Sequence, residues 1–280
     1  MRRLVANGLL TINQLVSSKR FSHETENASA LVFAPHPDDE VLGCGGVIAL
    51  KAQARARVQV VVMTDGGASH KGMIAADDLV RIRRAEADEA ARRLGLAASY
   101  LFLGFEDHRL AEHHDVACDR VVESIVQFKP DEVYVPSRRD ELGDHVETNG
   151  IVRRALNRVG NPVAIFEYPV WLWNRWPWTA DNTRRGHGLV RGALRAASDV
   201  AEIVFACRTR IDVSRVLERK HAALAAYRSQ VERPNGKPEW PILSDVAKGE
   251  FLRCFDSSVE IFRRTDYRPT TLANPPKALV

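Results

Sequence analysis

The chain has 280 residues, of which 45% are hydrophobic and 27% charged. This composition is typical of a soluble globular protein and excludes a disordered or fibrous chain, and the length is sufficient for one large α/β domain with a single core. Lysine and arginine number 40 against 36 acidic residues, with a pI near 9.0. Because this excess is small and the arginines are spread over many segments, the charge does not favour a nucleic-acid partner.

The N-terminus and the cysteines indicate the compartment. Residues 1–27 predict a short amphipathic helix that packs on the domain or on a partner, since their apolar stretch is too short and too interrupted for a signal peptide. No stretch is long enough to cross a bilayer. The four cysteines are widely spaced without a CxxC pair, which indicates buried free thiols in a reducing cytosol. We therefore expect a cytoplasmic protein.

The most informative stretch runs from residue 30 to residue 51. The apolar run at residues 30–33 predicts a buried strand, and residues 47–51 predict a helix. His36, Asp38 and Asp39 lie between the two. The end of a strand that leads into a helix is where open α/β sheets place their ligand crevices.

An imidazole and two carboxylates within four residues favour a divalent metal as their partner. His36 and Asp39 are three residues apart, so a helical turn brings both to one point and leaves Asp38 free to act as a base. Pro35 and Pro37 restrict the backbone and would pre-organise the ligands. The alternative interpretation is an acidic helix N-terminus that interacts favourably with the helix dipole.

The next segments alternate between strands and helices. We predict a central parallel strand at residues 58–64, a helix at 77–94 closed by Gly95, a strand at 99–103, a helix at 115–128 and a strand at 132–136. Polar residues follow each of these strands. Three successive strand ends that carry polar groups indicate a shared crevice.

The last part of the chain predicts further strands at residues 163–168, 201–206 and 259–262, and a helix at 214–227. Four of the five tryptophans lie within eight residues, 171–178. Their rings suit the apolar faces of sugars, or alternatively the core of a flap or a dimer contact, which leaves a homo-oligomer open. Residues 179–198 are basic and predict an insertion near the pocket mouth.

The stretch at residues 34–46 resembles the opening signature of the PIG-L/LmbE-like zinc-dependent N-deacetylases, in which a strand leads into A-H-P-D-D-E and a glycine-rich turn. Here one extra residue, Pro35, stands between the alanine and the histidine. The resemblance extends in order and spacing from about residue 31 to residue 264. It implies a Rossmann-like three-layer α/β sandwich with a mostly parallel sheet and an additional C-terminal strand and helix portion. Residues 28–265 would form this domain, between an N-terminal helical extension (1–27) and a C-terminal tail (266–280).

The resemblance also implies the metal site. One zinc ion per chain would be held by His36, Asp39 and His145 and would lower the pKa of a bound water to about 7, while Asp38 takes and returns the proton. The family reads His-Pro-Asp-His before its last ligand, whereas this chain has Leu142 and Gly143 in place of the first two residues. The role proposed for that histidine, to stabilise the oxyanion or protonate the leaving group, therefore has no counterpart at position 142.

Further residues are assigned by the same resemblance. Asp140 or Asp144 would orient a ligand imidazole. The predicted contacts to the sugar are Arg83 and Arg84 in an Arg-x-x-Glu segment, Asp107 in a Gly-Phe-x-Asp segment, and Trp171. The alternative for the two arginines is a solvated helix face with i,i+3 and i,i+4 ion pairs. His108, His113 and His114 are more typical of solvated histidines than of ligands.

The predicted function is that of an amidohydrolase that removes the acetyl group from an N-acetylated amino sugar of the N-acetylglucosamine type, or from its conjugate. One alternative is hydrolysis of another amide or, with a second metal, of a phosphoester. Another is a non-catalytic sugar-binding homologue. The ligand set could also accept iron or cobalt.

Overall fold

The computed structural model describes residues 1–17, 19–20, 23–97, 100–140, 143–180 and 189–268. Within these residues the strands are β1 (Lys19–Arg20), β2 (Ala30–Ala34), β3 (Val58–Thr64), β4 (Leu101–Phe105), β5 (Glu132–Pro136), β6 (Val163–Tyr168), β7 (Thr209–Asp212) and β8 (Val259–Tyr267). The α-helices are α1 (Arg2–Val16), α2 (His23–Asn27), α3 (Asp39–Gln53), α4 (Ala76–Leu94), α5 (His114–Phe128), α6 (Gly143–Val159), α7 (Leu189–Ala201), α8 (Leu217–Ala226), α9 (Arg228–Val231) and α10 (Glu250–Arg253). Shorter turns of helix are η1 (Leu110–His113), η2 (Trp171–Asn174), η3 (Glu202–Ala206), η4 (Ser214–Val216) and η5 (Leu243–Gly249).

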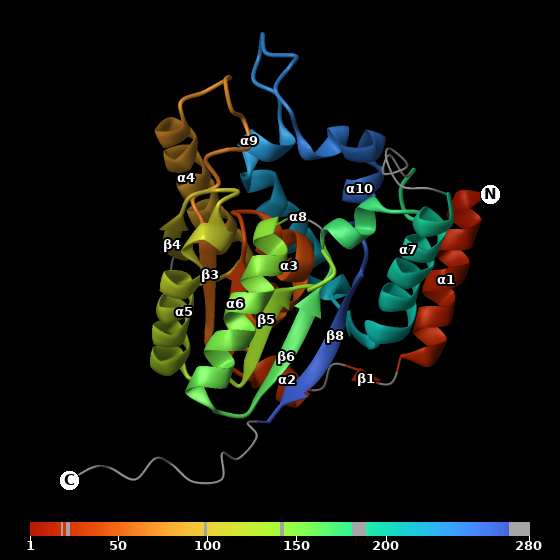
Figure 1. Cartoon of the computed structure of the whole chain (residues 1–280), viewed down its shortest axis with the longest axis horizontal. Helices are drawn as coiled ribbons and strands as arrows, with labels where there is room; N and C mark the ends of the chain where they lie inside the picture. Colours follow the sequence, from red (N-terminus) through yellow and green to blue (C-terminus); the bar gives the residue numbers. More distant parts are fainter. Residues whose placement is uncertain (18, 21–22, 98–99, 141–142, 181–188, 269–280) are drawn as a thin grey trace.

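The described strands form one sheet in the order β1-β7-β8-β6-β5-β2-β3-β4 (Figure 1). Strands β2 to β6 pair in parallel, whereas β8 runs antiparallel to both β6 and β7. The chain moves outward from β2 to β4 and then returns to place β5 on the other side of β2. This confirms the predicted fold class, and the reversal of strand order between β2 and β5 is where such sheets bind ligands.

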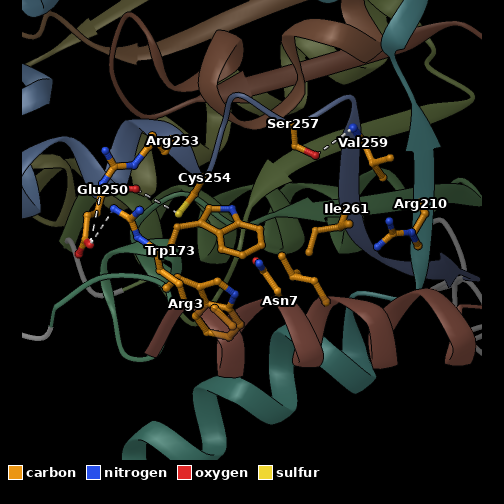
Figure 2. A pocket seen from close by; sticks show the side chains of 13 residues that line it. Arg3, Asn7, Trp173, Arg210, Glu250, Arg253, Cys254, Ser257, Val259 and Ile261 are labelled. Atoms are coloured by element: carbon orange, nitrogen blue, oxygen red, sulfur yellow. Dashed lines mark hydrogen bonds and ion pairs between the residues drawn. The ribbon is translucent and has the colours of Figure 1, made fainter. Parts of the chain in front are cut away.

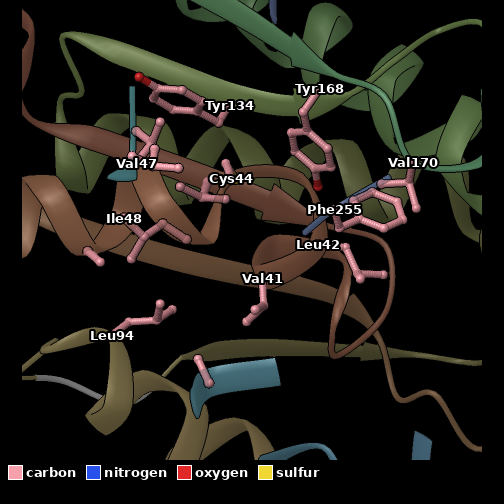
Figure 3. Packing of buried hydrophobic residues seen from close by; sticks show 14 of the residues in the cluster. Val41, Leu42, Cys44, Val47, Ile48, Leu94, Tyr134, Tyr168, Val170 and Phe255 are labelled. Atoms are coloured by element: carbon pink, nitrogen blue, oxygen red, sulfur yellow. The ribbon is translucent and has the colours of Figure 1, made fainter. Parts of the chain in front are cut away.

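Helices cover both faces of the sheet because the side chains of the buried strands alternate between two cores. Leu31 and Phe33 of β2 face a core shared with α5 and α6. Ala30 and Val32 face the opposite core, to which α3, α4 and α8 contribute. Figure 3 shows this second core, where Tyr134 of β5 and other sheet residues lie above the side chains of α3.

The glycine-rich start of α3 is required by close packing on β6. A Cβ atom at Gly43 would lie 2.1 Å from Cδ2 of Tyr168, far inside van der Waals contact. Tyr168 is itself fixed, because its hydroxyl donates a 2.6 Å hydrogen bond to the carbonyl of Phe33 in β2. The glycine therefore allows α3 to begin directly above the sheet.

Two predicted elements differ in the last third of the chain. The predicted strand at 201–206 is wrong, since this segment continues α7 as the helical turn η3. The amide of Asn13 in α1 lies within hydrogen-bond distance of the carbonyls of Ile203, Val204 and Cys207, which stabilises the helical form. The strand in this region is β7, which begins at Thr209, and β8 is longer than predicted.

The N-terminal helix predicted within residues 1–27 is present as α1, and it packs against η3 at the edge of the molecule opposite β4 (Figure 1). In the part of the chain that the structure describes, no helix has the length and hydropathy of a membrane span. Residues 269–280, which make up most of the predicted tail, and Leu142 lie outside the described residues.

Candidate metal centre

The candidate site lies at the carboxyl ends of three parallel strands. His36 and Asp38 follow β2, Asp107 follows β4, and Asp140 follows β5 just before α6. The first and last of these strands flank the point where the strand order reverses. The topology therefore brings together side chains from segments that are about a hundred residues apart.

Three ligand atoms converge on one point. The Oδ2 atom of Asp39 lies 3.1 Å from Nδ1 of His36 and 3.2 Å from Nε2 of His145. All three residues offer a ligand atom within 4.8 Å of the others. His145 is completely buried, and apart from the Asp39 carboxylate its Nε2 has no polar partner among the described residues. Imidazole nitrogens and a carboxylate oxygen that are buried together at one point fit a bound cation, which would pair with all of them.

Asp140 holds the ring of His145 in place. Its Oδ2 lies 3.1 Å from Nδ1 of His145, and its two oxygens accept hydrogen bonds from the backbone amides of Val170 (3.2 Å) and Leu172 (3.1 Å). A carboxylate fixed in this way keeps the proton of the imidazole on Nδ1. The lone pair of Nε2 then faces Asp39 and is available to a cation.

Two further carboxylates surround the other ring nitrogen of His36. Its Nε2 lies 3.0 Å from Oδ1 of Asp107 and 3.2 Å from Oδ2 of Asp144. Asp144 also accepts hydrogen bonds from the amides of His108 and Leu110, and Asp107 accepts one from Ala68. Oδ1 of Asp107 is buried, and apart from the ring of His36 it has no polar partner among the described residues. His36, Asp107 and Asp144 thus form a second group that could hold a cation.

The charges of the cluster shift its pKa values in both directions. Burial works against the charged form of His145, but Asp39 and Asp140 outweigh it and raise the pKa of His145 to about 9. Burial likewise opposes the ionised form of Asp39, but His145 and His36 hold the pKa of Asp39 well below its usual range. Without a metal, the histidines and carboxylates therefore neutralise one another.

Asp38 has an unusual backbone and an unusual pKa. It is 6% exposed and adopts φ 126° and ψ −28°, a strained conformation for a residue other than glycine. Burial raises the pKa of Asp38 to about 8, with Arg83 acting in the opposite direction. Nη2 of Arg83 lies 3.1 Å from Oδ2 of Asp38, and the same guanidinium donates to the carbonyls of Pro37 and Gly66. Arg83 thus holds both the carboxylate and the strained turn.

The residues predicted to contact the sugar lie in different places. Arg83 is 2% exposed and contacts Asp38, which the sequence did not reveal. Arg84 is exposed, with its guanidinium 4.9 Å from the ring centroid of Phe102. Trp171 stacks on Phe251 at 4.9 Å, and Asp107 alone of the four reaches the metal-binding groups. The Arg-x-x-Glu segment is the sequence feature that could have indicated a buried Arg83. Its glutamate, Glu86, is also buried and accepts two hydrogen bonds from Ser229.

The comparison with known families identifies this part of the chain. Residues 31–156 match the family model described as PIG-L, GlcNAc-PI de-N-acetylase. The match covers 126 of the 280 residues and shows that this segment is similar to the PIG-L family. The matched segment contains every residue of both candidate metal-binding groups, from His36 to His145. The resemblance predicted from the sequence is therefore confirmed.

Curated relatives match most of the chain. A protein of Rhodococcus erythropolis is 27% identical over 257 residues, which cover 78% of this chain and 86% of the relative. A protein of Acidothermus cellulolyticus is 27% identical over 246 residues, or 72% of this chain and 80% of the relative. Both are named 1D-myo-inositol 2-acetamido-2-deoxy-alpha-D-glucopyranoside deacetylase.

Solved structures share the fold at lower identity. The N,N'-diacetylchitobiose deacetylase of Pyrococcus horikoshii is 20% identical, with a TM-score of 0.59 over 88% of this chain and 86% of its own. GalB of Pseudomonas putida, a 4-carboxy-2-hydroxymuconate hydratase, is also 20% identical, with a TM-score of 0.57 over 89% of this chain and 99% of its own. A deacetylase and a hydratase thus share this fold, so the site rather than the fold must decide the reaction.

Proposed function

We propose that the chain is a zinc-dependent hydrolase that removes the acetyl group from an N-acetylated amino sugar of the N-acetylglucosamine type, or from a conjugate of that sugar. The observation that carries this proposal is the convergence of His36, Asp39 and His145 beside Asp38. Support comes from the match of residues 31–156 to the PIG-L family model and from relatives named as deacetylases of an inositol-linked 2-acetamido-2-deoxyglucose. We further propose a cytoplasmic location, which the absence of disulfides among the four cysteines supports.

His36, Asp39 and His145 would hold a single zinc ion. Two imidazoles and one carboxylate are a common catalytic set for zinc and leave coordination positions open for water and substrate. A zinc ion in this position supplies Lewis-acid chemistry, which polarises the amide carbonyl and makes a water more acidic. Asp140 would keep His145 in the ligating tautomer, and Asp144 would orient His36 through its Nε2.

Asp38 would carry the proton transfers. Its carboxylate accepts a proton from the water that attacks the acetyl carbonyl, and it returns this proton to the nitrogen of the departing amine. The pKa of about 8 in the metal-free site lies near neutrality, which suits a group that must both accept and donate. Arg83 would keep the carboxylate aimed at the centre while it changes charge.

Asp107 remains our candidate for a contact to the sugar. It lies beside His36 and Asp144, and a carboxylate oxygen has two lone pairs, so its Oδ1 could accept a bond from a substrate hydroxyl besides its contact with His36. We do not assign Arg84 or Trp171 to the substrate, because their side chains pack on Phe102 and Phe251.

The second metal-binding group gives a second candidate function. If His36, Asp107 and Asp144 held another ion, the centre would have two metals, as many phosphoesterases do. Metal stoichiometry separates the two candidates, since one zinc per chain favours the deacetylase and two favour the phosphoesterase.

The test is release of acetate from a panel of N-acetylated sugars and their conjugates, with metal content measured on the same samples. Asp38→Asn should retain one zinc and lose activity by about 10²–10⁴-fold, the usual contribution of general acid–base catalysis. His145→Ala should lose the zinc. Asp119→Asn is the matched control, because this exposed aspartate of α5 pairs with Arg158 of α6, away from the candidate metal centre. A zinc-loaded wild type that cleaves phosphoesters but no acetamide would contradict the proposal.

A further inference from the structure

A cavity of about 320 Å³ lies beneath the N-terminal helix (Figure 2). We call it the α1 pocket, and its lining comes from α1, the tryptophan-rich segment 171–178, β7, α10 and β8. Among the lining residues are Arg3, Trp173, Trp178, Arg210, Glu250 and Arg253. None of these residues belongs to either metal-binding group. The volume falls within the range of small-molecule sites.

Apolar side chains form the body of the α1 pocket. Trp173 and Trp178 are 8% and 7% exposed and meet edge to face, with ring centroids 5.3 Å apart. Figure 2 shows the indole of Trp173 facing Ile261 and α1. Nε1 of Trp178 is buried and has no hydrogen-bond partner. The walls therefore offer a large apolar contact surface together with an unused donor.

The charged residues of the α1 pocket are three arginines and a single acid. Glu250 lies 3.8 Å from both Arg3 and Arg253, but it also pairs with Arg2 and accepts a hydrogen bond from the amide of Ala180. One carboxylate is thus shared among three guanidinium groups. The pocket therefore has an excess of positive charge.

Arg210 is the most informative of these cations. It lies opposite Ile261 in the β7–β8 register and donates a 2.7 Å hydrogen bond to Oδ1 of Asn13. Among the described residues no carboxylate forms an ion pair with it. The guanidinium of Arg210 is partly removed from water, and this desolvation lowers the pKa of Arg210. Such a cation beside an apolar cavity is the feature that an anionic head group would complete.

We propose that the α1 pocket binds a small amphipathic anion, with an apolar body against Trp173 and Trp178 and one carboxylate, sulfonate or phosphate group paired with Arg210. This site is independent of the proposed hydrolase reaction. A cationic or zwitterionic ligand fits less well, because its positive group would need a carboxylate and that of Glu250 already pairs with arginines. The shared chemistry of a fatty-acid carboxylate and a lipid-like phosphate is an aliphatic chain with an anionic end.

Fluorescence titration with anilinonaphthalene sulfonate, an aromatic body with one sulfonate, tests the proposal on the full-length protein. We expect saturable binding to one site, displaced by decanoate or decyl phosphate but not by decanol or decylamine. The relative strength of the two anions distinguishes a carboxylate head from a phosphate head. Arg210→Gln should weaken binding at least about tenfold, the loss expected for one charge-assisted hydrogen bond. Arg158→Gln, an exposed arginine on α6 paired with Asp119, should bind as the wild type does.

Two results would overturn the proposal: displacement by decanol as strong as by decanoate, or unchanged probe binding in Arg210→Gln. If Arg210→Gln does not fold by circular dichroism, Arg3→Gln replaces it, since this side chain is 73% exposed and its loss should not affect folding. A threefold or greater loss of affinity is then expected, and no loss would refute the site. Binding is measured without substrate, so failure here and failure of the proposed deacetylase are distinguishable.

Discussion

The orientation of His145 by Asp140 leads to a prediction that requires no knowledge of the substrate. Asp140 is 1% exposed and serves three donors, the Nδ1 of His145 and the amides of Val170 and Leu172. In Asp140→Asn one carboxylate oxygen becomes an NH₂ group. If the remaining oxygen stays at the Oδ2 position, it keeps His145 and Val170, but the NH₂ group faces the amide of Leu172.

The magnitude follows from these contacts. One buried amide without an acceptor costs about 1–3 kcal/mol of unfolding free energy. The weaker acceptor also holds the imidazole less firmly in its ligating tautomer, and loss of such an orienting group typically lowers metal affinity by about 10–100-fold. This corresponds to about 1.4–2.8 kcal/mol of binding free energy.

The assay is a zinc competition titration against a chromophoric chelator, combined with chemical denaturation of the metal-free protein. Asp119→Asn, which removes an exposed carboxylate, should change neither the zinc affinity nor the free energy of unfolding by much. If Asp140→Asn loses stability but binds zinc within about twofold of the wild type, Asp140 supports only the backbone of η2. The argument that it orients His145 would then be wrong.

Three further predictions concern stability. Lys51→Met should cost about 3–5 kcal/mol, because Lys51 is completely buried, pairs with Glu132 at 2.8 Å and would leave that carboxylate without its cation. Gly43→Ala should cost at least about 1–3 kcal/mol, since its Cβ would overlap the ring of Tyr168. The unfolding free energy of the metal-free protein should fall from about pH 4 to about pH 8, and Asp38→Asn should flatten this decrease. The sign follows because Asp38 has a folded pKa of about 8 against an ordinary value of 3.8, so the folded state holds a proton that the unfolded state releases in this range.

Each of these stability predictions has its own control, measured by urea denaturation. The double variant Lys51→Met with Glu132→Gln should recover part of the loss, and a loss equal to the sum of the single variants would refute coupling between them. Gly8→Ala should be neutral or stabilising, because no atom lies within 4 Å of its added Cβ. A wild type whose stability falls from pH 5 to pH 8 no more steeply than that of Asp38→Asn would contradict the raised pKa.

Local sequence signals determined much of the fold. The β-branched run at residues 58–64 became β3 with the predicted bounds, because a continuous apolar run of this length suits a strand buried on both faces. Helix α4 ends at Leu94 as predicted, with Gly95 at φ 90°, since a glycine adopts this left-handed closing conformation without strain. His36, Asp38 and Asp39 were visible as a candidate metal motif because their chemistry lies within four residues.

Other features depend on contacts between distant segments, which local patterns do not contain. Residues 202–206 have the composition of a strand but form η3, because the amide of Asn13, 190 residues earlier, bonds the carbonyl of Ile203. From the sequence alone, Arg83 could equally be a solvated helix residue. The fold places its side chain against Asp38.

The sequence by itself determined the order of the elements and the chemistry of the motif after β2, which consists of His36, Asp38 and Asp39. Both depend on residues that are neighbours in the chain. Only the tertiary structure decided how Asp140 and Asp107 serve that motif, and only it formed the α1 pocket. The reason is that ligand geometry, burial and pKa depend on distances in space, and these are fixed by the parallel strand order that folds separate segments onto one sheet edge.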